Sequence, residues 1–174
     1  MEEKKNIIFI GLMGSGKTTI GKQVSKALGM EFFDTDHAVE VKTGVNIATI
    51  FELEGEEGFR LREHSLLVDL MDNQKKVIAT GGGIVLNGEN RKLLRQLGAV
   101  VYLRSNINDL ILRLKNDKTR PLIQNVNLDE KFNELFKARD PLYIEVADYI
   151  IDTKNKKVSD IKNEVLELLN KCKQ

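Results

Sequence analysis

Five short apolar runs, each about the length of a β-strand, constrain the fold of this chain more than any other feature of its sequence. They are rich in Ile, Val and Phe and lack the alternating polar residues of a strand with one solvent-exposed face. Such runs are typical of strands that are buried on both faces, as in a parallel sheet covered by helices. They occupy residues 6–10, 31–33, 76–79, 99–103 and 149–151.

Stretches with the spacing of amphipathic helices lie between these runs. In the first, apolar residues recur at Ile20, Val24 and Leu28, and Gly29 follows as a typical helix end. Similar spacing predicts helices around residues 66–70, 93–97, 132–136 and 161–169, the last with Ser159 as its N-cap. The alternation of strands and helices predicts a three-layer αβα domain, in which right-handed crossovers place helices on both faces of a parallel sheet.

The size and composition of the chain exclude several classes of protein. Its 174 residues predict one domain, spanning residues 1–174, and the net charge of +1 argues against a general nucleic-acid-binding surface. No apolar run approaches the ~18 residues of a membrane span. The single cysteine, Cys172, has no partner for an intrachain disulfide, which fits a reducing compartment. We therefore expect a cytoplasmic protein that binds neither nucleic acid nor membrane. We also expect a monomer, because the sequence shows no long exposed apolar stripe.

Residues 11–18, directly after the first apolar run, have the sequence GLMGSGKT and match the pattern G-x-x-x-x-G-K-[ST]. A triphosphate needs many donors around one concavity, and the three glycines allow backbone N–H groups to converge. The helix that follows adds its own N–H groups, Lys17 adds a cation, and the Thr18 hydroxyl can bind Mg²⁺. A chance glycine-rich turn would lack this strand–loop–helix context. The loop alone fits a GTPase, an ATPase or a small-molecule kinase.

Two carboxylates, Asp34 and Asp36, follow the second apolar run. At the end of a parallel strand they lie at the carboxyl edge of the sheet, where open α/β sheets bind their ligands. One could hold a metal-bound water, and the other could accept a hydrogen bond from a substrate hydroxyl. The alternative is that either residue merely caps the next helix.

Three consecutive glycines, Gly81, Gly82 and Gly83, follow the third apolar run at the same edge. They expose bare backbone, which favours close contact with a ligand. The alternative is a flexible turn, although one glycine would suffice for that.

Two arginines could bind a carboxylate, because the guanidinium group is a planar fork that matches it. Arg60 lies near the start of a predicted helix, where the local sequence alone favours a surface residue paired with Glu63. Arg139 continues an apolar stripe and should point inward, so it needs an anionic partner. That partner could be Asp140, Glu145 or a ligand carboxylate.

A third arginine, Arg120, precedes Pro121 in a segment of weak periodicity that predicts a mobile loop. On such a loop it could close over a triphosphate and stabilise the transferring phosphate. The alternative is a solvated loop charge. His37 and His64 lack the spacing of metal ligands and are expected to be structural or surface residues.

In their order along the chain, these motifs resemble those of the shikimate kinase family. The matching segments are residues 11–19, 33–36, 50–51, 55–60, 80–83, 119–122, 139–143 and 146–148, so the resemblance covers nearly the whole chain. It implies a P-loop fold with a five-stranded parallel sheet of order 2-3-1-4-5 and a mobile lid at residues 113–125. It also implies transfer of the γ-phosphate of ATP to the 3-hydroxyl of shikimate, on the route to chorismate and the aromatic amino acids.

The resemblance further implies roles for single residues. Asp36 is expected to bind the ring hydroxyls, Arg60 and Arg139 the carboxylate, Thr18 Mg²⁺, and Asp34 the metal through water. The expected catalytic residues are Lys17, Asp36 and Arg120. The expected ATP-binding residues are Gly14, Ser15, Gly16, Lys17, Thr18, Thr19, Arg113, Arg120 and Lys156. The expected substrate-binding residues are Asp36, Arg60, Gly81, Gly82, Gly83 and Arg139.

Two other functions are compatible with part of this pattern. A kinase for another small molecule, such as gluconate, would share the phosphate loop and the lid, but it would leave Asp36, Arg60 and Arg139 without a common task. A nucleotide-binding module that has lost catalysis would not need the expected catalytic residues together.

Overall fold

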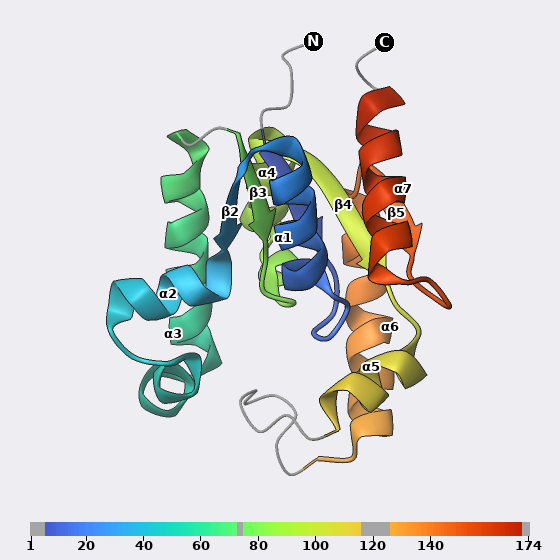
Figure 1. Ribbon diagram of the computed structural model, residues 1–174. Helices are drawn as coiled ribbons and strands as arrows, with labels where there is room; N and C mark the ends of the chain where they lie inside the picture. The colour runs from blue at the N-terminus through green and yellow to red at the C-terminus, as the bar shows by residue number, and fades with distance from the viewer. Residues whose placement is uncertain (1–5, 73–74, 116–125, 172–174) are drawn as a thin grey trace.

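The computed structural model describes residues 6–72, 75–115 and 126–171. Their centre is a five-stranded sheet in which all strands are parallel and run in the order β2-β3-β1-β4-β5 (Figure 1). The strands are β1 (Asn6–Ile10), β2 (Glu31–Asp34), β3 (Lys76–Ala79), β4 (Gly98–Arg104) and β5 (Tyr149–Asp152). The central strand β1 is buried along its whole length, as its uninterrupted apolar sequence predicts.

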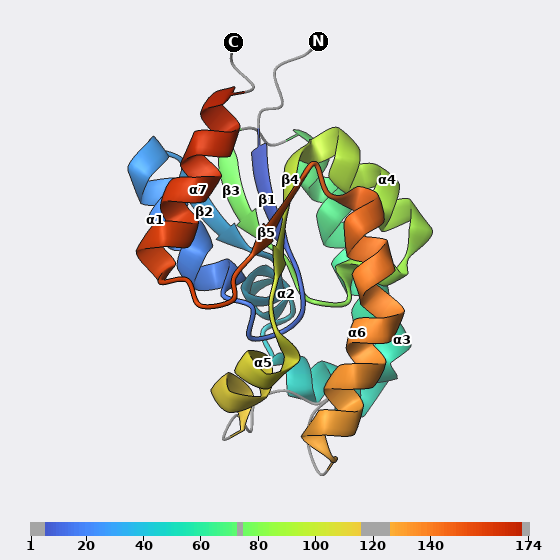
Figure 2. The same cartoon turned by 90° about the vertical axis from the view of Figure 1, so that its right-hand side faces the viewer.

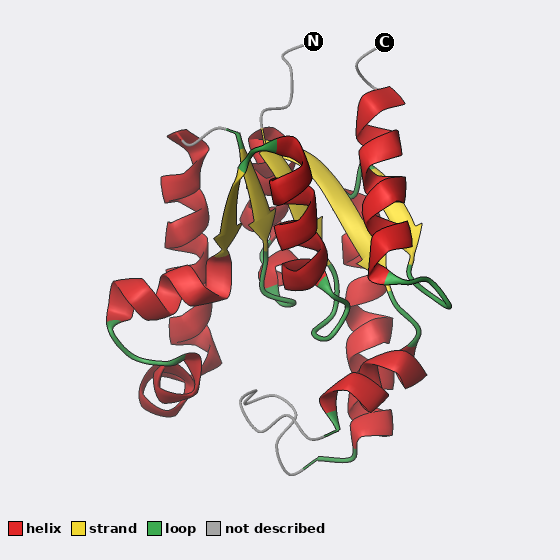
Figure 3. Ribbon diagram, in the orientation of Figure 1, coloured by secondary structure: helices red, strands yellow, loops and turns green. Residues whose placement is uncertain are grey.

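Helices cover both faces of this sheet and so form the three predicted layers, which Figure 2 shows from the side and Figure 3 by element type. On one face lie α1 (Lys17–Leu28) and α7 (Val158–Lys171), and on the other lie α3 (Ile47–Asp69), α4 (Gly88–Leu97) and α6 (Leu128–Val146). Ile20 and Val24 of α1 share a buried core with Val165 of α7. On the opposite face, Leu94 of α4 and Phe132 of α6 belong to a second core.

Two further helices lie toward the carboxyl edge of the sheet (Figure 1). They are α2 (Thr35–Thr43) and α5 (Ile107–Leu114), and the short 3₁₀ helices are η1 (Leu70–Asp72) and η2 (Ile84–Leu86). α2 packs against α3 through a small core that contains Val39, Ile50 and Phe59. Among the described residues, no helix combines the length and apolar character needed to cross a membrane.

The predicted sheet order and layers are confirmed, and the predicted strand ends are within one residue of those observed. The sequence pattern does not separate out α2 or α5, although Leu110 and Leu114 of α5 do have helical spacing. The N-cap prediction for α7 is wrong, because Ser159 is the second residue of that helix. The Asp160 carboxylate instead accepts the N–H of Lys157 at 3.1 Å, so a side chain inside the helix reaches back to its start.

Candidate active site

The phosphate loop joins β1 to α1 at the carboxyl edge of the sheet. Gly16 occupies the N-cap position of α1 with φ of 94°, a left-handed conformation that favours glycine. No side-chain cap covers this described helix start. The end of α1 therefore presents backbone N–H groups and a positive dipole end to an anion.

The ammonium group of Lys17 folds back onto the loop that precedes it. Its Nζ atom donates to the carbonyl of Gly11 at 2.8 Å and to that of Leu12 at 2.9 Å. Lys17 is buried, and both of these acceptors are neutral. A phosphate oxygen would be a stronger partner for this cation, because its negative charge adds Coulomb attraction to the hydrogen bond.

Asp34 connects the phosphate loop to α2. Its Oδ1 atom accepts the N–H groups of Asp36 and His37 at 3.0 and 3.2 Å and so caps α2. Its Oδ2 atom accepts the Thr18 hydroxyl at 2.9 Å. Asp34 therefore does cap the next helix, which was one of the two alternatives for this residue. Its other carboxylate oxygen remains beside the Thr18 hydroxyl. A carboxylate and a hydroxyl are hard oxygen ligands of the kind that Mg²⁺ prefers.

A cavity of about 380 Å³ opens over the phosphate loop, and we call it the phosphate-loop cavity. It is lined by every predicted ATP-binding residue that the structure describes, namely Gly14, Ser15, Gly16, Lys17, Thr18, Thr19, Arg113 and Lys156. Arg113 donates from Nη1 to the carbonyl of Gly14 at 2.8 Å. Lys156 pairs with Glu164 at 2.6 Å, so its ammonium already has a partner on α7. Arg120 and most of the predicted lid lie outside the described residues.

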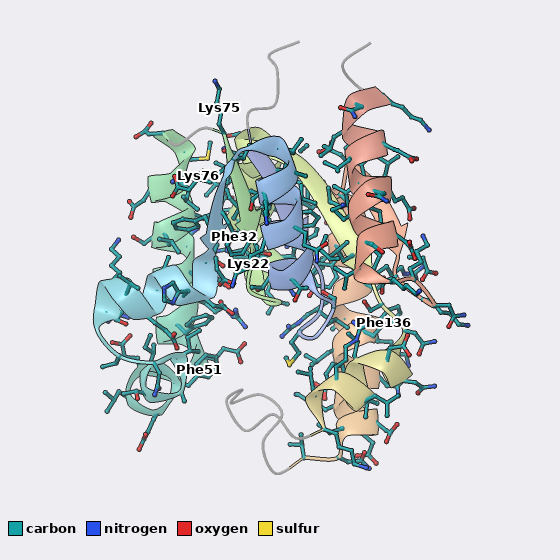
Figure 4. The ribbon with its side chains drawn as sticks, in the orientation of Figure 1. Lys22, Phe32, Phe51, Lys75, Lys76 and Phe136 are labelled. Carbon is teal, nitrogen blue, oxygen red and sulfur yellow. The ribbon has the colours of Figure 1, made fainter. Side chains whose placement is uncertain are left out.

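A second cavity, of about 270 Å³, lies beside the first, and we call it the arginine cavity. It is lined by all the predicted substrate-binding residues, namely Asp36, Arg60, Gly81, Gly82, Gly83 and Arg139. Phe51 from the first part of α3, labelled in Figure 4, and His37 from α2 also line it. The fold thus brings together residues of α2, α3, the triple glycine and α6, which are far apart in the sequence.

Arg60 is held by two acids of its own helix. Nη1 pairs with Glu63 and Nη2 with Glu56, each at 3.0 Å, while the buried Nε atom has no hydrogen-bond partner among the described residues. Glu63 is only 1% exposed, so this is not the surface pair that the sequence allowed. Burial raises the pKa of Glu63 to about 7, although Arg60 opposes the shift.

Arg139 is 4% exposed, as its place on an apolar stripe predicts. Neither predicted protein partner takes it, because Asp140 pairs with Arg104 and Glu145 lies with Arg91 and Arg95 on the surface. The Nη1 atom of Arg139 is buried and has no hydrogen-bond partner among the described residues. A buried cation of this kind is costly unless an anion pairs with it, which favours a ligand carboxylate.

The triple glycine allows these charges to approach the backbone. A Cβ atom at Gly83 would lie 2.2 Å from Nη2 of Arg60, and one at Gly81 would lie 2.6 Å from Oδ1 of Asp36. Side chains at either position would therefore displace the groups that line the arginine cavity. A flexible turn would require no such close approach.

The two cavities meet at Asp34, Asp36 and Gly82, which line both of them. A phosphate donor over the loop and an anionic acceptor beside the arginines would therefore face each other across Asp36. Holding two reactants in such an arrangement removes much of the entropic barrier to transfer.

Comparison with known proteins agrees with this geometry. A sequence model of the shikimate kinase family matches residues 13–170. The chain belongs to the shikimate kinase family. The shikimate kinase of Burkholderia thailandensis is 51% identical over 92% of this chain and 88% of its own length. The prediction of a P-loop kinase of this family is therefore confirmed.

Solved structures give the same result for the fold. The shikimate kinase of Acinetobacter baumannii, determined in complex with shikimate, superposes with a TM-score of 0.95 at 45% identity, covering 99% of this chain and 96% of that one. A gluconokinase from Sinorhizobium meliloti reaches a TM-score of 0.64 at 17% identity over 99% of this chain and 95% of its own, which shows a shared fold alone. Shikimate kinases and this gluconokinase thus differ in sequence more than in architecture.

The sequence did not reveal the roles of two side chains that support the arginine cavity from behind its lining. Glu63 is the most important, and a signal for it was present, since it lies three and four residues before Leu66 and Leu67 on the buried stripe of α3. Tyr143 donates its hydroxyl to the carbonyl of Gly82 at 2.5 Å, and it follows Arg139 by four residues on α6. Both residues share a helix face with a predicted arginine, and that spacing could have revealed them.

Proposed function

We propose that this chain transfers the γ-phosphate of ATP to the 3-hydroxyl of shikimate, giving shikimate 3-phosphate and ADP. The observation that carries the proposal is the junction of the two cavities, one over the phosphate loop and one beside Arg60 and Arg139, at Asp36. The shikimate bound to the similar kinase of A. baumannii supports this choice of acceptor. The product would serve the synthesis of chorismate and aromatic amino acids.

In this proposal the arginine cavity recognises shikimate by complementary charge. The buried Nη1 of Arg139 and Nε of Arg60 have donors to offer, and a carboxylate can accept from both. Asp36 lies where the two cavities meet, and there its carboxylate would accept a hydrogen bond from the attacking hydroxyl. Positioning matters more than base strength here, because phosphoryl transfer passes through a loose transition state.

The phosphate-loop cavity would hold ATP. Lys17 would exchange its carbonyl partners for phosphate oxygens, while the loop and the start of α1 supply N–H donors. Thr18 and Asp34 would hold Mg²⁺ together with phosphate oxygens, and the ion would neutralise charge on the transferring group. The described residues contain no group of three or more His, Cys, Asp or Glu side chains suited to a metal, which fits an ion held partly by its substrate.

Several expectations remain part of the proposal. They are a nucleotide-binding role for Arg113 and Lys156, a catalytic role for the lid residue Arg120, a monomeric state and a cytoplasmic location. Arg113 already contacts the loop through Gly14, which supports its role, whereas the ion pair of Lys156 with Glu164 leaves only its aliphatic stem to contact a base.

A coupled assay of ADP release tests the proposal directly. With ATP and Mg²⁺ present, shikimate should support turnover, whereas gluconate and an acceptor-free control should not. Turnover with gluconate in place of shikimate would indicate a different small-molecule kinase. Binding of ATP by calorimetry without turnover on any acceptor would indicate a nucleotide-binding module.

A further inference from the structure

A cluster outside both cavities joins α6 to the end of β4, and it pairs the buried residues Asp140 and Tyr102 with the exposed Arg104. The Asp140 carboxylate accepts the hydroxyl of Tyr102 at 2.7 Å and the Nε and Nη2 atoms of Arg104 at 2.9 and 2.7 Å. Asp140 is 8% exposed and Tyr102 only 1%. We call these three residues the Asp140 clamp. A carboxylate with three such donors is well satisfied, so it has no need of Arg139, its neighbour in sequence.

The clamp lies beside an interruption in the hydrogen bonding of α6. Pro141 lies inside this helix, one residue after Asp140. Proline lacks the N–H that would bond to the preceding turn, and its ring crowds the carbonyl four residues earlier. The helix therefore needs tertiary contacts to fix the direction of the residues around Pro141, and those of Asp140, the preceding residue, are among them.

Tyr102 of the clamp is connected to the arginine cavity through Tyr143. The rings of Tyr102 and Tyr143 pack with their centroids 4.8 Å apart, and the Tyr143 hydroxyl donates to the carbonyl of Gly82. The Arg104 guanidinium also lies 5.5 Å from the ring centre of Phe136, which Figure 4 labels on α6. α6 therefore contacts β4 through Asp140 and Phe136, and it contacts the triple-glycine segment through Tyr143.

We infer that Asp140, held by Tyr102 and Arg104, is a positioning residue that fixes the guanidinium of Arg139 in the arginine cavity. Arg104 has a second effect, because it neutralises the Asp140 carboxylate and so prevents it from competing with a ligand for Arg139. The inference rests on the proposed function, since it assigns the clamp to recognition of the acceptor carboxylate. It predicts that damage to the clamp weakens the acceptor and spares the nucleotide.

The test compares Asp140→Asn with the wild-type enzyme. Asparagine keeps the shape of the side chain but loses the charge, and one of its two polar atoms becomes a donor facing Arg104. We expect the KM for shikimate to rise about tenfold, while the KM for ATP changes less than about twofold. Tyr102→Phe, which removes one hydrogen bond and keeps the ring, should give a smaller change of the same kind.

A double-variant comparison separates positioning from general damage. If Asp140 acts through Arg139, then adding Asp140→Asn to Arg139→Ala should raise the KM for shikimate by less than about twofold further. A persistent tenfold rise in that background would overturn the inference. So would equal changes in the KM values for ATP and shikimate.

Asn6→Ser provides a matched control at the opposite edge of the sheet. The Asn6 amide donates to the carbonyl of Leu97 at 3.0 Å and accepts the N–H of Lys76 at 2.9 Å, so this variant also disrupts a buried polar group. It should lower the melting temperature without changing the ratio of the two KM values. If the wild-type enzyme does not use shikimate, both the proposed function and this inference are wrong. If the wild type is active but Asp140→Asn has the same KM for shikimate, only the inference is wrong.

Discussion

The two cavities of this kinase offer an anion different kinds of donor group. The phosphate-loop cavity is centred on one continuous segment, residues 14–20, which offers the backbone N–H groups of the loop and of the start of α1. The arginine cavity is built from side chains on α2, α3 and α6 and from the triple glycine after β3. The first thus depends largely on backbone groups of one loop, whereas the second is an assembly of charged side chains from several elements. A triphosphate can therefore be bound largely by backbone groups, while recognition of one particular acceptor requires side chains held in fixed positions.

The largest expected effect is at the one side-chain cation of the described phosphate loop. Lys17→Met removes the charge and keeps an apolar stem of similar length, so the loop can still bind nucleotide while transfer loses its charge stabilisation. We expect kcat to fall by roughly 10³-fold in the coupled assay, with shikimate affinity by calorimetry nearly unchanged.

Lys22→Met is the matched control for this variant. Lys22 lies on the same helix beside Phe32, as Figure 4 shows, and it lines neither cavity. Its replacement should leave kcat within about twofold of the wild type, because surface substitutions have small effects. A similar loss of turnover in both variants would mean that helix damage, rather than the lost loop cation, explains the result.

A smaller effect is expected in the arginine cavity, where the two arginines should differ. Arg139→Ala and Arg60→Ala should each raise the KM for shikimate about 100-fold, because each removes a charged hydrogen bond to the carboxylate. Arg60→Ala also leaves Glu63 buried beside a lost partner, so it should lower the melting temperature more than Arg139→Ala. Equal losses of ATP and shikimate affinity would contradict a cavity dedicated to the acceptor.

The triple glycine gives a sharper test of close approach. Gly83→Ala would place a methyl group against the end of the Arg60 side chain, which must then move. We expect the KM for shikimate to rise about tenfold with little change in the melting temperature, since the obstacle is the end of a flexible side chain. Gly88→Ala is the control, because its methyl group would meet nothing closer than 3.6 Å. Unchanged kinetics in Gly83→Ala would show that Arg60 has room to spare.

The same contrast explains how much could be predicted from the sequence. The phosphate loop was predictable in detail, because eight consecutive residues fix both its shape and its chemistry. The sheet order came from the family resemblance, and its strands came from apolar runs that needed no tertiary information. Asp36, Arg60 and Arg139 could be named by resemblance, but their convergence on one cavity depends on helix packing that no local pattern describes.

Glu63 and Asp140 show where local reasoning ends. Both were considered as simple ion-pair partners of a neighbouring arginine. The structure places Glu63 in the interior with Arg60, whereas it turns Asp140 away from Arg139 toward Tyr102 and Arg104. Adjacent residues on a helix point about 100° apart, so the choice of partner is made by the element on the other side. Only the fold supplies that element.

The smallest expected effect is a dependence of acceptor binding on pH. Burial raises the pKa of Glu63 to about 7. The charge of Asp36 adds to this rise, whereas the charges of Arg60 and Arg139 oppose it. Tyr143 also lies close enough to interact with Glu63. Because the folded pKa lies above the ordinary value of 4.5, this group stabilises the fold fully below about pH 4.5, and that contribution is lost as pH rises through about 7.

Binding of a carboxylate beside Arg60 and Arg139 adds negative charge next to Glu63 and should raise its pKa further. Binding is therefore coupled to proton uptake, and shikimate affinity should fall about fivefold as pH rises from about 6 to 8. Glu63→Gln, which is neutral at every pH, should bind shikimate with a flat profile over this range. Calorimetry in two buffers of different ionisation enthalpy measures the proton uptake directly. An unchanged slope in Glu63→Gln would assign the pH dependence to another group and leave the Arg60–Glu63 pair a fixed structural element of α3.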